Sequence, residues 1–568
     1  MSKALVKVLA AAVILLAGTL NTVIAQDASF DIVRFQVEGN SILPVERVQA
    51  LVAPFVGRKK IYGDVQKALE ALEGDYRRLG YGTVQVYVPE QELTTGVVRL
   101  QVSEGVVGKV TITGNKHFND ANVRASLPNL KEGTAPNMRQ LSENVQLSNE
   151  NPAKQVEVTL GVSEEEGKVD AKVEVKEEDP NRVYLTLDNT GTKASGKNRV
   201  GVSYQNANMG NSDQVLTLAY TTAIDVLNGE THAPARSGVR VDIFSVGYRL
   251  PLYSIGDSID LIYGNSSTNT PASVLAPGGL LAINGKGEVV SLRYNHIFPR
   301  AGEFTSKLVM GLDYKYMNSR CTTNGQPGPV DPGNPLLVSS CLPYTLRPVT
   351  ATYSGQWQKP GEAIDFNLGL THHLFPMGSR YSYAITPPGA AGSDRYSFIS
   401  TRQTPDRFSA LRFGGSYSAA LSGDWLGRAA LSGQYAQSPL PSGEQLGLTG
   451  STAVRGFLER AVAADRGYVA NLEVYSPDYA GKLGLEGALK GIVFYDWASG
   501  NNLAALGGGF AISNVASAGI GFRYNLKKDI SARLDIARVM QGHQPIPGTA
   551  EAANPGDIRG HFGLAFGF

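Results

Sequence analysis

Apolar and polar residues alternate over the carboxyl-terminal two-thirds of the chain. In one segment, Val290 and Leu292 fall on one side of an extended strand, and Arg293 and Asn295 fall on the other. Successive side chains of a strand point to opposite faces, so each such segment has an apolar and a polar face. Short turns alternate with long loops between the segments. The pattern predicts a 16-stranded antiparallel transmembrane β-barrel at 181–568, with lipid outside and a wet lumen inside.

The last segment, HFGLAFGF, has a wholly apolar face. That face carries Phe562, Leu564, Phe566 and Phe568. The polar groups of an open sheet edge have no hydrogen-bond partner in hydrocarbon, so the last strand of a membrane barrel has to pair with the first. We therefore expect this strand to close the barrel and its four large side chains to face lipid.

The region before the barrel contains a repeat. An alternating strand stopped by Gly-Asn ends at Asn40, and a second one ends at Asn115. Apolar residues then recur at helical spacing: Val65, Leu69, Leu72, Tyr76 and Leu79 in the first copy, and Met138, Leu141 and Val145 in the second. Each copy ends on further alternating strands. The repeat predicts two small α/β modules, at 28–105 and 106–180, each with helices on one face of a three-stranded sheet.

The amino terminus and the composition indicate an exported protein. Lys3 and Lys7 precede an apolar run, and Ala25 closes a small-residue cleavage signal, so 1–25 is expected to be a signal peptide. Glycine (64 residues) and tyrosine (25 residues) are abundant, as is typical of membrane barrels. The net charge of +1 argues against nucleic acid as a partner, because nucleic-acid-binding surfaces are strongly basic.

Two cysteines, Cys321 and Cys341, bracket a loop rich in proline and glycine, and in an exported chain they are expected to form a disulfide. Gly191–Asn198 imitates a phosphate-binding loop, but Asn198 stands where Ser or Thr is required and a strand follows instead of a helix. No catalytic residue, metal site, nucleotide site or cofactor is predicted.

Two modules followed by a barrel resemble the polypeptide-transport-associated (POTRA) domains and barrel of the outer-membrane assembly and secretion superfamily. The two-partner secretion branch, the haemolysin and filamentous-haemagglutinin secretion-activation family, is the nearer match. Its loop motif VRGY/F matches Val454, Arg455, Gly456 and Phe457, and its strand motif matches Phe494 and Asp496, although Ala498 stands where glycine is common. The terminal aromatic strand also resembles the signal read by the barrel assembly machinery.

The resemblance implies that the loop at about 438–466 folds into the lumen. Eleven residues of its shorter arm can span roughly 36 Å at about 3.3 Å each, which exceeds the thickness of the membrane core. Strand parity places Phe494 and Asp496 on one face, so Asp496 can face the lumen opposite Arg455 and form a bidentate ion pair. Only about four residues separate the predicted cleavage point from the first strand, so we expect no plug helix.

The resemblance further implies transport of an unfolded partner exoprotein across the bacterial outer membrane, with the two modules in the periplasm. Capture by strand addition is expected at the strand formed by Thr83, Val84, Gln85, Val86, Tyr87 and Val88, or at 110–113. Expected partners are the exoprotein, outer-membrane lipids and the barrel assembly machinery, with neither nucleic acid nor nucleotide. Two alternatives remain: a factor that inserts other barrels, and a barrel enzyme or porin.

Overall fold

The computed structural model describes residues 29–92, 95–191, 197–224, 242–267, 271–276, 279–284, 287–317, 322–323, 326–327, 344–374, 404–405, 407–503, 511–527, 529–543 and 553–568. The predicted signal peptide, Cys321 and Cys341 lie outside these residues. The described residues contain no helix long and apolar enough to cross a membrane. Contacts divide the chain into two compact units, and the second unit contains the barrel together with 110–130, 139–160 and 171–180.

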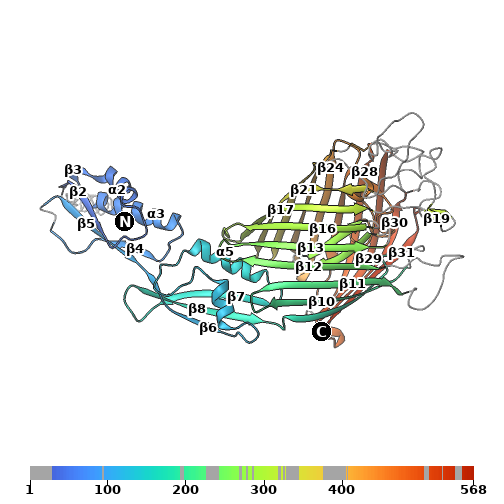
Figure 1. Cartoon of the computed structure of the whole chain (residues 1–568), viewed down its shortest axis with the longest axis horizontal. Helices are drawn as coiled ribbons and strands as arrows, with labels where there is room; N and C mark the ends of the chain where they lie inside the picture. The colour runs from blue at the N-terminus through green and yellow to red at the C-terminus, as the bar shows by residue number, and fades with distance from the viewer. Residues whose placement is uncertain are drawn as a thin grey trace, which may run out of the picture. The chain divides into compact units, whose positions relative to one another are not determined.

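The first module consists of a three-stranded sheet and two helices (Figure 1). The sheet has the order β2-β5-β4, with β2 parallel to β5 and β4 antiparallel to it. Its elements are β1 (Phe30–Ile32), β2 (Arg34–Glu38), α2 (Val45–Val52), η1 (Ala53–Phe55), β3 (Gly57–Lys60), α3 (Tyr62–Arg78), β4 (Val84–Tyr87) and β5 (Val97–Glu104). The sequence pattern did not indicate the small additional pairing of β1 with β3.

Helix α3 supplies the core of this module. Val65, Leu72 and Tyr76 are buried at helical spacing against the sheet, as the sequence pattern predicts, and Leu69 is half-buried. Leu79, which the same pattern placed on this face, is exposed because it lies beyond the end of the helix. The helix ends at Arg78, and Gly80 follows with a φ of 102°, a conformation that glycine adopts more readily than any other residue.

One buried carboxylate and one half-buried carboxylate make the first module sensitive to acid. The side-chain hydrogen bond from Arg47, 2.5 Å from Nε to Oδ2, lowers the pKa of Asp75. Burial alone would raise the pKa of Glu104, but hydrogen bonds from Ser41, Ile42 and Tyr76 outweigh it and lower that pKa. A carboxylate with a lowered pKa in the folded state stabilises the fold above its unfolded pKa of about 4 and loses that contribution as the pH falls further.

We therefore expect the free energy of unfolding of the first module to decrease as the pH falls below about 4. Pulse proteolysis of the full chain in urea, read at the fragment that carries α3, measures this decrease. The Asp75→Asn variant should be less stable than the wild type at pH 7 and should lose less stability on acidification. An acid dependence of equal size in the wild type and the variant would contradict the assignment to Asp75.

The second module repeats the plan of the first. Its sheet has the order β6-β8-β7. Its elements are β6 (Val106–Thr113), α4 (Asp120–Ser126), α5 (Met138–Asn149), β7 (Lys154–Val162) and β8 (Lys168–Glu177).

Helix α5 departs from the predicted apolar stripe. Leu141 is buried as expected, whereas Met138 is exposed and Val145 is half-buried. Asn144 and Ser148 lie on the buried face instead. The physical reason is a polar partner: the side-chain amide of Asn144 donates to the backbone oxygen of Tyr253, 2.7 Å away in a turn of the barrel. The buried face of this helix is therefore partly polar, and hydrophobic periodicity alone could not locate it.

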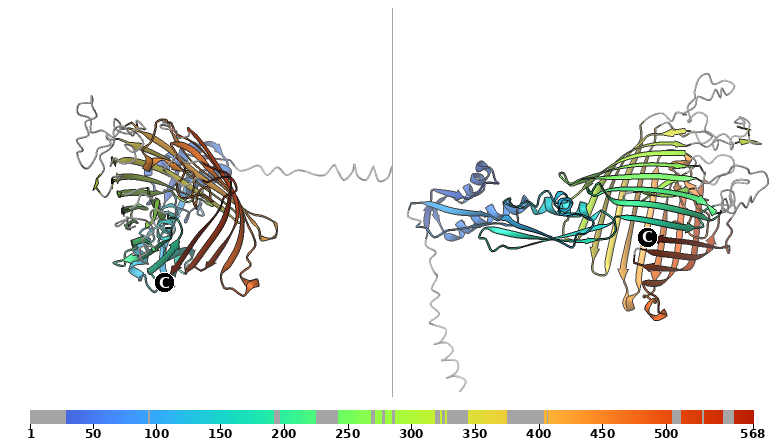
Figure 2. Two further views of the ribbon diagram at one scale, coloured as in Figure 1. Left: turned by 90° about the vertical axis from the view of Figure 1, so that its right-hand side faces the viewer. Right: turned by 60° about the horizontal axis from the view of Figure 1, so that its bottom comes forward.

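The remainder of the chain forms a closed antiparallel barrel (Figures 1 and 2). Since β20 and β21 both pair with β17, they form one interrupted strand, and the described wall has sixteen strands. The wall consists of β9 (Asn181–Asp188), β10 (Arg199–Met209), β11 (Gln214–Ala223), β12 (Ile243–Leu252), β13 (Asp257–Ser266), β16 (Gly287–Ile297), β17 (Phe304–Met317), β20 (Tyr344–Leu346), β21 (Pro348–Lys359), β22 (Glu362–His373), β23 (Ser409–Ala420), β24 (Leu426–Ala436), β27 (Arg466–Tyr475), β28 (Ala488–Asn501), β29 (Ile512–Leu526), β30 (Ile530–Gln541) and β31 (Ile558–Gly567).

Short segments complete the list of elements. They are β14 (Pro271–Ala276), β15 (Gly279–Asn284), β18 (Thr322–Thr323), β19 (Gln326–Pro327), β25 (Leu446–Gly447), β26 (Ala463–Ala464), η2 (Ser422–Asp424), η3 (Ser442–Glu444) and η4 (Gly481–Leu483).

The barrel closes as the sequence predicts, by pairing of the last strand with the first. Phe566 of β31 is opposite Leu185 of β9, and the backbone N–H of Phe568 donates to the oxygen of Val183 at 2.9 Å. The inner and outer faces also follow the predicted alternation. Val290 and Leu292 are exposed on the outer face, whereas Ser291 between them is buried. In the described residues, this pairing joins the first and last strands of the wall over 184–188 and 563–567.

Candidate functional site

The loop between β24 and β27 returns into the lumen of the barrel. Val454 and Phe457 near its tip are completely buried. They belong to one apolar cluster with residues of four consecutive wall strands: Val469 of β27, Ala498 of β28, Val515 of β29 and Val539 of β30. Because the large apolar residues on the other face of these strands are exposed, the contacts place the loop tip against the inner wall. We call residues 437–465 the lumen loop.

Arg455 at the tip of the lumen loop forms a bidentate ion pair with Asp496 of β28. Its Nε lies 2.7 Å from Oδ2 and its Nη2 lies 2.7 Å from Oδ1. The backbone N–H of Arg455 donates to the same carboxylate at 3.1 Å. Asp496 has no exposed surface, and its neighbours Val493 and Tyr495 are exposed on the outer face. Side chain and backbone together fix the position of this arginine.

Further wall groups surround the guanidinium of Arg455. Nη2 lies 2.9 Å from Oε1 of Glu473 on β27, and Nη1 lies 3.7 Å from Oδ1 of Asp535 on β30. The guanidinium carbon lies 3.5 Å from the ring centroid of Phe494, which gives this motif residue a cation–π contact. Three carboxylates from three strands therefore face one cation. Removing these four charged groups from water costs free energy that offsets much of their attraction. The cluster is therefore better suited to fix one loop position than to add stability.

The tip makes two further contacts with the wall, both through Gly456. Gly456 has a φ of 93°, and a Cβ there would lie 3.3 Å from the Cβ of Ala537 on the wall. Its backbone N–H donates to Nε2 of His561 at 2.9 Å. His561 belongs to β31, the strand that closes the barrel. Any larger residue at position 456 would strain the backbone and displace the loop from the wall.

The predicted capture strands occupy sheet edges. β4 (Val84–Tyr87) is the outer strand of the first module, and β6, which contains 110–113, is an outer strand of the second. Thr83 and Val88 flank β4 outside the strand itself. Gln85 and Tyr87 are exposed. The edge is partly covered from within the module, because the backbone N–H of Val86 donates to Oε1 of Glu73 at 3.0 Å.

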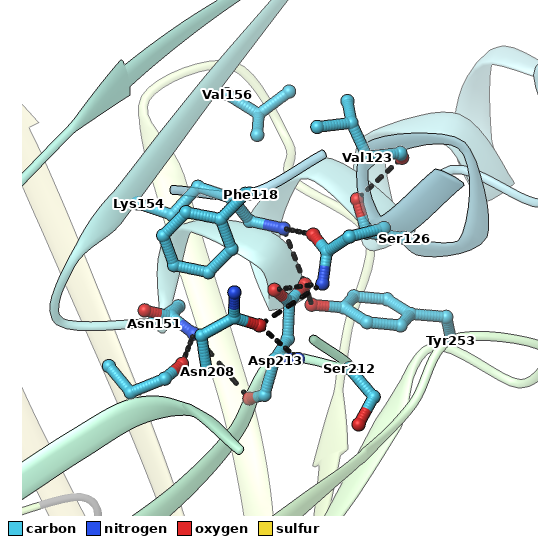
Figure 3. A network of polar contacts seen from close by, with 12 residues as sticks. Phe118, Val123, Ser126, Asn151, Lys154, Val156, Asn208, Ser212, Asp213 and Tyr253 are labelled. Atoms are coloured by element: carbon cyan, nitrogen blue, oxygen red, sulfur yellow. Dashed lines mark hydrogen bonds and ion pairs between the residues drawn. The ribbon is translucent and has the colours of Figure 1, made fainter. Parts of the chain in front are cut away.

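A buried polar network joins α4 and β7 of the second module to two turns of the barrel, between β10 and β11 and between β12 and β13 (Figure 3). Lys154 and Asp213 form an ion pair in which neither side chain is exposed. Asn122 donates to Asp213 at 2.9 Å and accepts from Nζ of Lys154 at 3.0 Å. Tyr253 donates to Asp213 at 2.5 Å. We call these four residues the Asp213 network.

Electrostatics within the Asp213 network follow from burial. Burial lowers the pKa of Lys154, and the charge of Asp213 opposes that shift. Burial and the same carboxylate raise the pKa of Tyr253 well above its usual value. The lysine ammonium also lies 5.1 Å from the ring centroid of Phe118. A second ionic contact joins the module to the wall, since Glu150 lies 3.0 Å from Arg249 and 2.8 Å from Lys307.

Several of these residues were not predicted from the sequence. Glu473 and Asp535 occupy polar positions of strands with alternating apolar and polar residues, so the sequence predicts that they face the lumen. Their contact with Arg455 depends on the register between strands of the barrel, which the sequence does not show. Lys154 has no local signal of burial. Among the described residues, no group of three or more His, Cys, Asp or Glu could hold a metal ion.

The sequence of this chain matches two known protein families. Residues 30–105 match the family described as POTRA domain, ShlB-type. Residues 167–324 and 364–524, together more than half of the chain, match the family described as haemolysin secretion/activation protein ShlB/FhaC/HecB.

Curated relatives and solved structures agree with these matches. The outer membrane transporter CdiB of Dickeya dadantii (strain 3937) is 21% identical over 444 residues, which cover 78% of this chain and 71% of that protein. CdiB of Escherichia coli O6:K15:H31 (strain 536 / UPEC) is 22% identical over 476 residues, covering 81% and 72%.

Two solved structures share the fold. CdiB from Escherichia coli superposes with a TM-score of 0.66 at 17% identity, over 96% of this chain and 92% of that one. CdiB from Acinetobacter baumannii gives 0.64 at 14% identity, over 95% and 90%. The fold is therefore shared with solved structures, and the family matches extend over the first module and much of the barrel. The chain belongs to the haemolysin secretion/activation protein ShlB/FhaC/HecB family.

Proposed function

We propose that this outer-membrane protein exports a partner exoprotein by two-partner secretion, with the modules capturing unfolded cargo in the periplasm and the barrel acting as the conduit. The observation that carries the proposal is the lumen loop, whose tip is attached to the inner wall through Arg455 and Asp496. A loop attached inside the lumen suits a conduit that has to be closed between transport events.

Capture is proposed at the outer edge of β4. An extended cargo segment can add to this edge as a further strand, with main-chain hydrogen bonds providing affinity and exposed side chains providing selectivity. Glu73 already accepts from the N–H of Val86, so the incoming strand has to displace this carboxylate. Glu73 also pairs with Arg77 at 3.0 Å, which gives it an alternative partner after displacement.

Passage is proposed to require movement of the lumen loop tip. The tip packs against β27 to β30 through its apolar residues and its arginine. An extended polypeptide needs a continuous wet path, and the polar residues on the inner face of the wall can line it without binding one sequence. The proposed function includes no chemical step and no cofactor.

Site-specific photo-crosslinking tests the capture proposal. A photoreactive amino acid at Gln85 or Tyr87 should crosslink the exoprotein whose secretion is lost when this transporter is deleted. The same amino acid at Gln66, which is exposed on α3, is the matched control in the same module. We expect at least severalfold more crosslinked product at the β4 positions. Equal yields at Gln66 and Gln85 would contradict capture at the β4 edge.

A further inference from the structure

The lumen loop has a second ionic contact with the wall, made with other strands than those its tip contacts. Glu444 in η3 is 2% exposed. Its Oε1 lies 2.7 Å from Nζ of Lys315 on β17, and its Oε2 lies 2.7 Å from Nη2 of Arg412 on β23. A loop carboxylate is therefore held by two wall cations. We call this arrangement the base anchor, and the ion pairs of Arg455 the tip anchor.

The base anchor is reinforced by hydrogen bonds to the loop backbone. Gln434 donates to the backbone oxygen of Glu444 at 3.0 Å, and Arg412 donates to the same oxygen at 3.3 Å. Arg412 also donates to Gln434 at 2.8 Å, which fixes the orientation of its guanidinium. Nearby, the backbone N–H of Gly443 donates to the hydroxyl of Tyr344 at 3.2 Å. The base is thus fixed by side chains of β17, β20, β23 and β24.

The two anchors use different parts of the wall and opposite charges. Around the barrel, β17 to β24 form one stretch and β27 to β30 form the next. The first stretch presents cations to a loop carboxylate, and the second presents carboxylates to a loop arginine. A loop shifted along the wall would bring like charges together, which disfavours other positions. The charges therefore specify a single loop position.

The two arms of the lumen loop are connected to each other near the base anchor. Arg460 donates to the backbone oxygens of Ser442 at 3.1 Å and Gln445 at 2.9 Å, and Leu446 pairs with Ala464. The arm that leads to the tip and the arm that leaves it are therefore held together at the base.

From this arrangement we infer that Glu444 is a second positioning residue for the lumen loop, and that Glu444 and Arg455 together hold the loop as a closed strap between two stretches of the barrel wall. The inference rests on the proposed function for its consequence, which is control of the conduit. Loss of either anchor should increase the time that the pore spends open.

The first test measures the pore of the purified full-length protein in a planar bilayer. We expect Glu444→Gln, which removes the charge with little change in shape, to raise the open fraction on the order of tenfold over wild type, equivalent to about 1.4 kcal/mol. Lys315→Met should have a similar effect, and the double variant should not exceed the larger single effect by more than about twofold, because both substitutions break one contact.

A matched control removes a different carboxylate. Asp365 on β22 hydrogen-bonds to the wall residue Ser416, so Asp365→Asn removes the same charge without touching the base anchor. Its open fraction should stay within about twofold of wild type. Unheated gels verify that each variant barrel is folded. An open fraction for Glu444→Gln equal to that of the control, in a folded barrel, would overturn the inference.

The second test does not depend on transport. A nitroxide label at the exposed Ser442, read by electron paramagnetic resonance, should become more mobile in Glu444→Gln and remain unchanged in Asp365→Asn. If the label becomes more mobile in Glu444→Gln but the wild-type protein secretes no exoprotein, the anchor is supported and the proposed function is contradicted. An immobile label in Glu444→Gln would contradict the anchor even if secretion is normal.

Discussion

Secretion of the partner exoprotein should fall at least tenfold when Arg455 is replaced by alanine, while the barrel remains folded in the outer membrane. The substitution leaves Asp496, Glu473 and Asp535 close together without their shared cation. Removing one member of a buried charge cluster typically costs about 3–5 kcal/mol. The loop tip should therefore leave the wall. Ions should then pass more often, but a loop without a fixed position can obstruct the path of the polypeptide, which is why secretion should fall.

Secretion assays with the exoprotein in culture supernatant measure this effect, and unheated gels measure the amount of folded barrel. Arg455→Lys is the informative companion, because lysine keeps the charge but cannot make the bidentate contact with Asp496. It should give an intermediate loss. Arg460→Ala is a second companion: it removes a loop arginine that donates to Ser442 and Gln445 at the base and leaves the contacts of Arg455 in place, so its loss of secretion should be smaller. Normal secretion by Arg455→Ala would exclude the tip anchor from the transport mechanism.

The contribution of Asp496 can be separated by a double variant. If the two residues act as one contact, Arg455→Ala combined with Asp496→Ala should secrete no less than Arg455→Ala alone. Glu473 and Asp535 still surround Arg455 in the single Asp496→Ala variant, so that variant should retain part of the attachment. Its loss of secretion should be smaller than that of Arg455→Ala.

Much of the tip anchor could be predicted because strand parity is strict. Once Val493 and Tyr495 are assigned to lipid, Asp496 has to face the lumen. Glu473 and Asp535 follow the same parity on their strands. Their convergence on one arginine could not be predicted, because it depends on the relative register of β27, β28 and β30, which a single sequence does not encode locally.

The contacts of the second module with the barrel were less accessible to sequence reasoning. Lys154 begins a strand and Asp213 ends a tight turn, and both residue types are usually exposed at such positions. Asp213 has a φ of 59°, which fits a turn and carries no sign of burial. The buried polar face of α5 was missed for the same reason. Hydrophobic periodicity predicts burial against apolar neighbours, and here the neighbours are polar.

Replacing Lys154 by methionine should detach the second module from the barrel turn. The substitution leaves the carboxylate of Asp213 buried without its cation, which typically costs about 3–5 kcal/mol. We expect faster hydrogen exchange in α4 and at the start of β7, together with a strong loss of secretion, in a barrel that stays folded. The network fixes the position of the second module against the barrel turns, so its loss should shift the module while the barrel stays folded.

Two controls distinguish the loss of the buried Lys154–Asp213 ion pair from the loss of any lysine in this module. Lys168→Met removes a partly exposed lysine from the same module, where the ion pair with Glu165 is worth at most about 1 kcal/mol, and should leave exchange and secretion nearly unchanged. The double variant Lys154→Met with Asp213→Leu removes both charges, so its docking should be more stable than that of Lys154→Met alone. Equal exchange rates in Lys154→Met and Lys168→Met would contradict a docking role for the network. If the double variant regains stability but not secretion, the buried charges are needed for the orientation of the module and not for its attachment.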